Sequence, residues 1–188
     1  IINGGFDVTI LNNMTTVGGA VFTGTGELIL AGTEVVASAN VSVSNVTVNS
    51  TGTATFSSDD EDATPTWRTF TVTGVLDQTA GNIDIKGNSI LLSCSTGDVF
   101  DRTAGNWSAT TGALIFDPAA NAAVAFNPGA GWSIPNLTID HSGAVETVTT
   151  DDDEAFTVTG LLNLVDGVLH TEDGVGSKDG LRTLGNGA

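Results

Sequence analysis

The chain has 188 residues, with 22 Asp and Glu against 5 Lys and Arg, which gives a formal net charge of −17 at pH 7. Nucleic acids and anionic membrane surfaces bind clustered Lys and Arg, so the scattered basic residues of this chain exclude both as partners. A hydrophobic fraction of 40% is enough to build a core, which excludes a disordered chain.

Short runs of alternating apolar and polar residues recur along the chain, separated by Gly, Asn, Asp and Ser. The expected strands lie at 8–11, 20–24, 27–32, 41–50, 70–74, 82–87, 90–95, 113–116, 123–127, 136–140, 145–150 and 156–165. No intervening segment has the length and apolar stripe of a three-turn helix, and no apolar run approaches the ~18 residues of a membrane span. The pattern predicts an all-β protein.

Cys94 is the only cysteine, which excludes an intramolecular disulfide and a CxxC metal site. It lies within the apolar run ILLSCS at 90–95. A lone thiol in such a run is typical of a buried and inert core position.

Three phrases occur twice in the same order: GTGELIL and TTGALIF, NVTV and NLTI, and FTVTGVL and FTVTGLL. The two copies start about 90 residues apart, a spacing that indicates internal duplication. We therefore expect one elongated domain over residues 1–188, with repeats at about 18–104 and 105–188. The two copies should form equivalent coils, with Phe70 and Phe156 pointing inward at corresponding levels.

These phrases resemble the repeats of secreted bacterial and archaeal surface proteins of the adhesin-like, right-handed parallel β-helix type. The resemblance covers roughly residues 18–169. It implies a solenoid fold and a surface location, and it transfers no catalytic residue to this chain.

The composition of the chain independently favours the same fold. The stacked coils of a solenoid bury Val, Ile, Leu and Phe, and Gly and Asn tolerate the left-handed backbone of its corners. Two β-sandwich or jelly-roll domains are the alternative, since about 90 residues also suit an immunoglobulin-like unit. The Cys and Trp spacing of that unit is absent, and no Pro-rich linker separates the copies.

Two acidic clusters, at 59–62 and 151–154, occupy corresponding places in the copies. Adjacent carboxylates supply the oxygen ligands that Ca²⁺ requires. The candidate calcium ligands are Asp59, Asp60, Asp62, Asp151, Asp152 and Asp153. The D-x-D-x-D-G spacing of a calcium loop is missing, so we expect solvated corners and no cofactor, with calcium as the alternative.

Six Asn-x-Ser/Thr sequons are glycan acceptors in an exported chain. Asn45 and Asn136 are the paired residues of the repeat and are better explained as corners. The glycosylation candidates are Asn13, Asn40, Asn49 and Asn106.

Residues that point to catalysis are few. His141 lies in the contiguous run Asp-His-Ser at 140–142, which cannot converge as a triad because neighbours on a strand point to opposite faces. We expect this run to form a solvent-exposed turn. Trp67, Trp107 and Trp132 are either packing residues or stacking platforms for sugars, and Trp67, beside Arg68 in an inserted segment, is the most suggestive.

The sequence thus predicts a secreted, non-catalytic structural or adhesive protein of a cell surface, forming a rod or filament. Expected partners are further copies of the chain, glycans or a host surface. A viral tail fibre, spike or capsid decoration is one alternative, and a polysaccharide-degrading β-helix enzyme is another, since 22 acidic residues supply many carboxylate pairs.

If the acidic clusters are solvated corners, millimolar Ca²⁺ will raise the melting temperature no more than NaCl of matched ionic strength, because salt alone screens their repulsion. Binding of Ca²⁺ to the folded state alone would instead add about 2.7 kcal/mol to the free energy of unfolding when the Ca²⁺ concentration is a hundred times Kd. A calcium-specific rise that disappears on changing Asp152 and Asp153 to Asn would refute the expectation.

Overall fold

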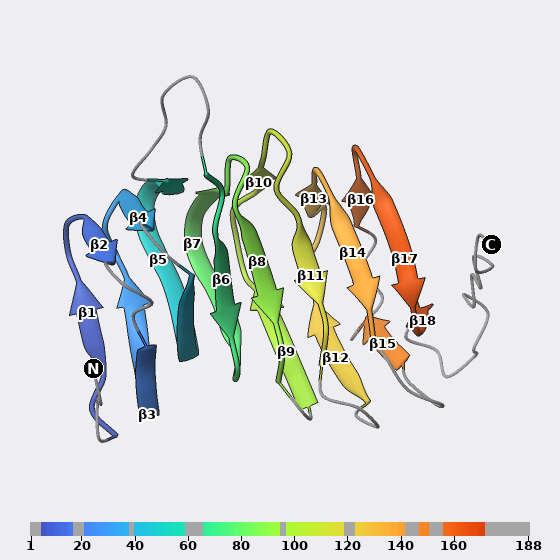
Figure 1. The fold of residues 1–188 in the computed structure, drawn as a ribbon, viewed down its shortest axis with the longest axis horizontal. Helices are drawn as coiled ribbons and strands as arrows, with labels where there is room; N and C mark the ends of the chain where they lie inside the picture. Colours follow the sequence, from blue (N-terminus) through green and yellow to red (C-terminus); the bar gives the residue numbers. More distant parts are fainter. Residues whose placement is uncertain are drawn as a thin grey trace.

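The computed structural model describes residues 5–16, 21–37, 40–58, 66–94, 97–118, 123–141, 147–150 and 156–171. These residues form strands, turns and loops and contain no helix, and therefore no helix long and apolar enough to cross a membrane. All strand pairs in the described residues are parallel. The fold is a β-solenoid, as predicted, and not a pair of β-sandwiches (Figure 1).

Each coil passes through three faces, named A, B and C in chain order. Face A holds β1 (Val8–Ile10), the second part of β3 (Val21–Leu30), the middle of β5 (Val41–Ser58), the first part of β7 (Leu76–Asp84), β9 (Gly97–Arg102), β12 (Val124–Asn127), β15 (Thr147–Thr150) and β18 (Val168–His170). Face B holds β2 (Met14–Thr16), β4 (Glu34–Ala37), the ends of β5 and β7, β10 (Trp107–Ser108), β13 (Ser133–Ile134) and β16 (Thr157–Val158).

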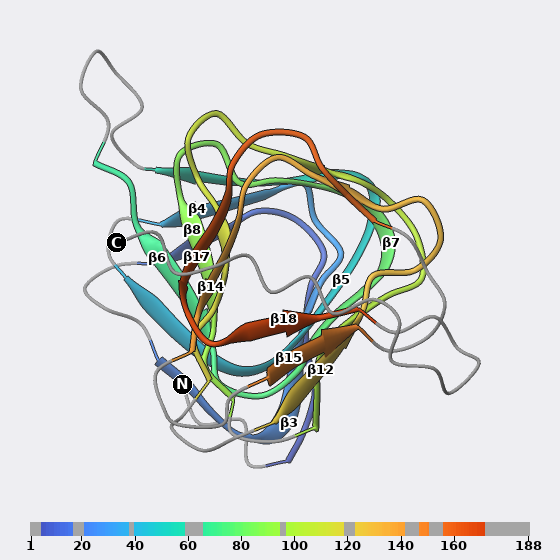
Figure 2. The ribbon, with the colours of Figure 1, turned by 90° about the vertical axis from the view of Figure 1, so that its right-hand side faces the viewer.

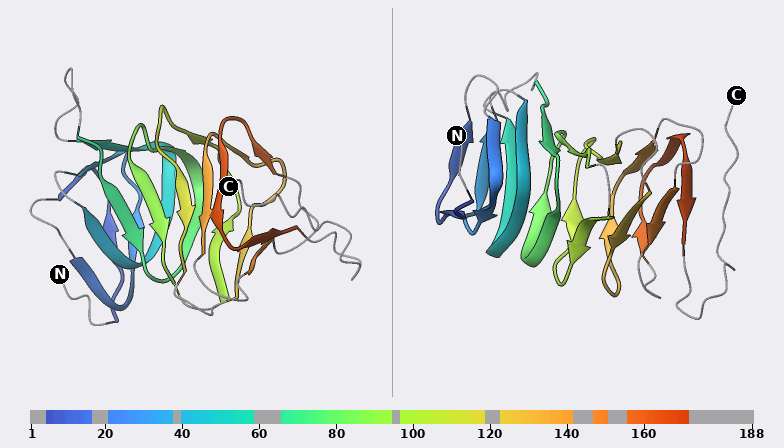
Figure 3. Two further views of the ribbon diagram at one scale, coloured as in Figure 1. Left: turned by 45° about the vertical axis from the view of Figure 1, so that its right-hand side comes forward. Right: turned by 90° about the horizontal axis from the view of Figure 1, so that it is seen from below.

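Face C holds the starts of β3 and β5, followed by β6 (Thr69–Val72), β8 (Ser89–Leu92), β11 (Leu114–Phe116), β14 (Leu137–Asp140) and β17 (Leu162–Asp166). Viewed along the stack, the chain turns counterclockwise as it approaches the viewer, so the solenoid is right-handed (Figure 2). The coils follow one another in sequence order along the long axis (Figure 3).

The interior of the coils is apolar because alternate residues of each strand point inward, as the alternating burial of β6, β8 and β11 shows. Phe100, Phe116 and Phe126 are fully buried, and the rings of Phe100 and Trp107 surround that of Trp132 at centroid distances of 5.1 and 6.1 Å. Cys94 is buried in the core, as predicted.

Asparagine side chains join successive coils at the corners. In four cases within the described part of the chain, an Asn Oδ1 accepts a hydrogen bond from a backbone N–H of the next coil. The pairs, with their distances, are Asn40 and Thr69 (3.0 Å), Asn45 and Val75 (3.1 Å), Asn82 and Asn106 (3.0 Å), and Asn136 and Leu161 (3.0 Å). The side chain thus satisfies a corner amide that has no strand partner.

The repeated phrase FTVTG forms the same corner in both copies. Gly74 N–H donates to the Ser44 carbonyl at 2.7 Å, and Gly160 N–H donates to the Pro135 carbonyl at 2.7 Å. The corners nevertheless occupy different positions in the coil. Phe70 lies within β6 of face C, whereas Phe156 directly precedes β16 of face B.

We predicted equivalent coils, with Phe70 and Phe156 at corresponding places. Both rings pack against the core, but the second copy is displaced by one face relative to the first. GTGELIL and TTGALIF differ in the same way, because Leu28–Leu30 lie on face A and Leu114–Phe116 on face C. The long repeat therefore reproduces a corner and its strands without matching a whole number of coils.

Replacing Asn136 by Ala will lower the free energy of unfolding by at least about 1 kcal/mol, because its amide also donates to the Gly112 carbonyl at 2.8 Å and both bonds are lost. Urea unfolding measures the change. Asn163→Ala, at an exposed position of β17, is the matched control. Equal losses in the two variants would contradict the role of the corner bonds.

Candidate functional site

Face C carries a column of uncharged side chains along its centre. Its members lie in register on successive coils: Val21, Ser42, Thr71, Leu91, Ile115, Thr138 and Asn163. We name this set the neutral column. On the described strands of face C, charged residues occur only where β14 and β17 end, at Asp140 and Asp166.

Face A carries acidic residues in the corresponding outward positions. Asp77 and Asp101 lie opposite each other on adjacent strands, and the Glu27 side chain is hydrogen bonded to Thr47. Burial raises the pKa of the Asp77 carboxyl above its usual value, and the nearby charges of Asp101 and Glu27 raise it further. On the described strands, the centre of face C is therefore uncharged, whereas the facing positions of face A carry carboxylates.

The corner between faces B and C holds Trp67, the only one of the three tryptophans with an exposed indole. Its ring packs directly on Gly87 of the next coil, and a Cβ at Gly87 would overlap the ring atoms. Trp67 is 36% exposed, whereas Trp107 and Trp132 are 5% and 0% exposed. Trp107 and Trp132 are therefore core residues, and only Trp67 is available as a platform.

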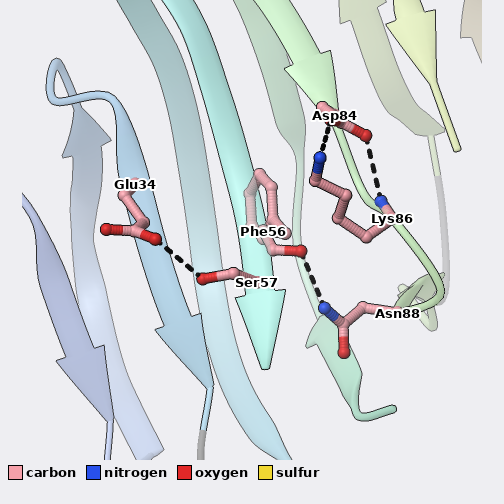
Figure 4. Close-up of polar contacts among 6 residues, drawn as sticks. All are labelled: Glu34, Phe56, Ser57, Asp84, Lys86 and Asn88. Atoms are coloured by element: carbon pink, nitrogen blue, oxygen red, sulfur yellow. Dashed lines mark hydrogen bonds and ion pairs between the residues drawn. The ribbon is translucent and has the colours of Figure 1, made fainter. Parts of the chain in front are cut away.

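Neighbouring polar contacts fix this corner (Figure 4). The Lys86 ammonium pairs with Asp84 at 3.0 Å, and the Lys86 N–H donates to the same carboxylate at 3.1 Å. Asn88 is buried, its amide donates to the Phe56 carbonyl at 2.7 Å, and its Oδ1 accepts from Arg68 N–H at 2.7 Å. The two segments that carry Trp67 and Gly87 are thus held together.

A hollow of about 210 Å³ lies at the other edge of face B, on successive coils. Its lining residues are Thr53, Asn82, Asn106, Trp107 and Ser108. These residues offer hydrogen-bonding groups and no titratable side chain.

A second polar corner, between faces A and B, was missed in the sequence analysis. Arg102 is 7% exposed, and its guanidinium donates to the carbonyls of Gly105 at 2.6 Å and Pro128 at 2.8 Å. Gln78, one coil earlier, donates to the Gly81 carbonyl at 2.7 Å. The related segments LDQTAGN at 76–82 and FDRTAGN at 100–106 are the sequence signal of this corner.

All six candidate calcium ligands, Asp59, Asp60, Asp62, Asp151, Asp152 and Asp153, lie outside the described residues. Within the described part of the chain, no group of three or more His, Cys, Asp and Glu side chains is placed to hold a metal ion. The calcium alternative therefore stays a prediction.

The four glycosylation candidates are exposed. The Asn13 amide, the atom that would carry a glycan, donates to Glu34 at 3.0 Å, and Asn40 Oδ1 is bonded to the next coil. Asn49 and Asn106 are the candidates whose side chains make no such bond among the described contacts. Asn45 and Asn136 are corner residues, in agreement with their interpretation from the sequence.

The prediction of an exposed turn at His141 was wrong, because the residue is fully buried. It follows β14 directly, and its N–H donates to the Asp166 carbonyl at 3.2 Å, which draws the segment onto the next coil. Nearby, burial and the charge of Asp140 raise the pKa of Asp117, while His141 lowers it. Ser142 lies outside the described residues.

We compared the chain with protein-family models, with curated proteins and with solved structures, and none of the three comparisons gave a match.

Changing Asp77 to Asn will increase the free energy of unfolding at neutral pH. A pKa raised in the folded state means that the folded protein binds the proton more tightly than the unfolded chain, so stability falls as the pH rises through that pKa. The gain should vanish below the ordinary pKa of aspartate. Chemical denaturation at several pH values measures it, with the exposed Asp98→Asn as the charge-matched control. Equal gains in both variants would contradict a local cause.

Proposed function

We propose that this chain is a secreted structural and adhesive surface protein, a stiff rod without a catalytic role. The stacked coils support the rod, since on faces A and C each strand of an inner coil is hydrogen bonded to the coil before and the coil after it. Such a rod is suited to holding side chains at fixed spacings of about 4.8 Å along its length.

The neutral column is the observation that carries the proposal. A net charge of −17 makes copies of the chain repel one another, and the repulsion is least where two uncharged surfaces meet. Leu91 and Ile115 give the column an apolar centre, and Ser42, Thr71 and Thr138 add small polar groups around it. Interface cores are depleted of charge in the same way.

The partner that this surface fits best is a second copy of the chain, packed side by side through face C. The acidic side chains of face A then stay in water, where salt screens them. The extracellular location agrees with this role and rests on the resemblance to secreted surface proteins.

Replacing Ile115 by Glu will abolish the lateral association, because it places a charge at the centre of the neutral column. Sedimentation velocity at physiological salt should show wild-type species that grow with concentration and an Ile115→Glu variant that stays monomeric.

Thr149→Glu is the matched control, because it adds the same charge to the outer surface of face A. It should associate as the wild type does. A wild-type chain that is monomeric at every concentration, or two variants that behave alike, would refute the proposal.

A further inference from the structure

The corner formed by Trp67, Arg68, Lys86, Gly87 and Asn88, here called the Trp67 corner, is built as a rigid platform. One side of the indole lies against Gly87, where any side chain would displace it, and about a third of the residue is open to water. A partly exposed indole held in one position offers an apolar face with a polar N–H at its edge, which suits it to stacking against a ligand.

The turn that carries Gly87 is held in one conformation. Lys86 has a φ angle of 52°, in the left-handed region that a residue with a side chain rarely adopts. The bonds from Lys86 to Asp84, and the bond from Asn88 N–H to the Ile85 carbonyl at 2.8 Å, hold this turn closed. Gly87 is thereby presented to the indole in one geometry.

A hydrogen-bond donor at this corner lacks an acceptor. Arg68 Nε is buried, and no acceptor among the described residues lies within hydrogen-bonding distance of it. No carboxylate of the described residues forms an ion pair with its guanidinium either, whereas the Lys86 ammonium is paired with Asp84. Unsatisfied buried donors are rare in folded proteins and require an explanation.

We propose that the Trp67 corner binds one ring of a neutral saccharide. The apolar face of a sugar ring packs on the exposed part of the indole, and its hydroxyl groups supply acceptors for the terminal guanidinium nitrogens of Arg68, which, unlike Nε, are not buried. The inference gives the adhesive role of the proposed function a ligand class, but it does not depend on association through face C.

A neutral sugar fits better than an acidic one. Among the described residues, the ammonium of Lys86 is paired with Asp84 and no carboxylate is paired with Arg68, so the Trp67 corner offers the guanidinium of Arg68 to a ligand. A net charge of −17 repels polyanions as they approach.

The binding test uses intrinsic fluorescence, because Trp107 and Trp132 are buried and a ligand at the surface changes the emission of Trp67. Maltohexaose, cellohexaose and chitohexaose are titrated separately, with hexagalacturonate as the acidic arm, and calorimetry gives the Kd. We expect saturable binding of at least one neutral oligosaccharide and weaker binding of hexagalacturonate.

Trp67→Ala should weaken binding by at least about tenfold, the factor equivalent to about 1.4 kcal/mol, and Trp67→Phe should retain part of the affinity. Gly87→Ala should weaken binding to a similar extent by displacing the ring. Gly52→Ala is its control, because a Cβ at Gly52 meets no neighbouring atom, and it should bind as the wild type does.

Circular dichroism shows whether each variant is folded, and sedimentation shows that association through face C is unaffected by Trp67→Ala. Failure of all four oligosaccharides to bind, preference for hexagalacturonate, or binding that survives Trp67→Ala would overturn the inference. None of these results would alter the expected behaviour of Ile115→Glu, so the two proposals fail separately.

Discussion

Hydrogen bonding between successive coils is the constraint on which the rest of the structure depends. A single coil is too thin to satisfy its own backbone, so each strand takes its partners from the coils on either side. Corners are the weak points of such a stack, because the chain turns there and the strand ladder is interrupted. The Oδ1 atoms of Asn45 and Asn136 accept hydrogen bonds from the N–H groups of Val75 and Leu161. These bonds continue the hydrogen bonding between coils at two of the turns.

Fixed stacking also determines what the surface presents. Because strands pair in register, every outward position becomes a column, and a residue type placed on several coils becomes a stripe. Face A acquires the facing carboxylates of Asp77 and Asp101, and burial, together with the charge of Asp101, raises the pKa of Asp77. Face C acquires the neutral column. At the Trp67 corner, the same stacking places the indole against Gly87 of the next coil.

The fold could be predicted because alternation, β-branched residues and repeated Gly and Asn are local signals of stacked strands. The face that each phrase occupies could not be predicted, since the strong FTVTG repeat marks a type of corner and not a position in the coil. The weaker similarity of LDQTAGN and FDRTAGN, which lie on adjacent coils, follows the true coil spacing. His141 and the contact of Trp67 with Gly87 were beyond prediction because burial at a corner depends on the neighbouring coil, which no local pattern specifies.

Residue-resolved amide hydrogen exchange tests the central claim most directly, since it asks whether the Asn corners belong to the coil ladder. The account predicts that the N–H groups of Val75 and Leu161 exchange as slowly as those of the adjoining strands, and that Asn45→Ala and Asn136→Ala each release only the corner they serve. Fast exchange at both amides in the wild-type protein, while the strands stay protected, would contradict it.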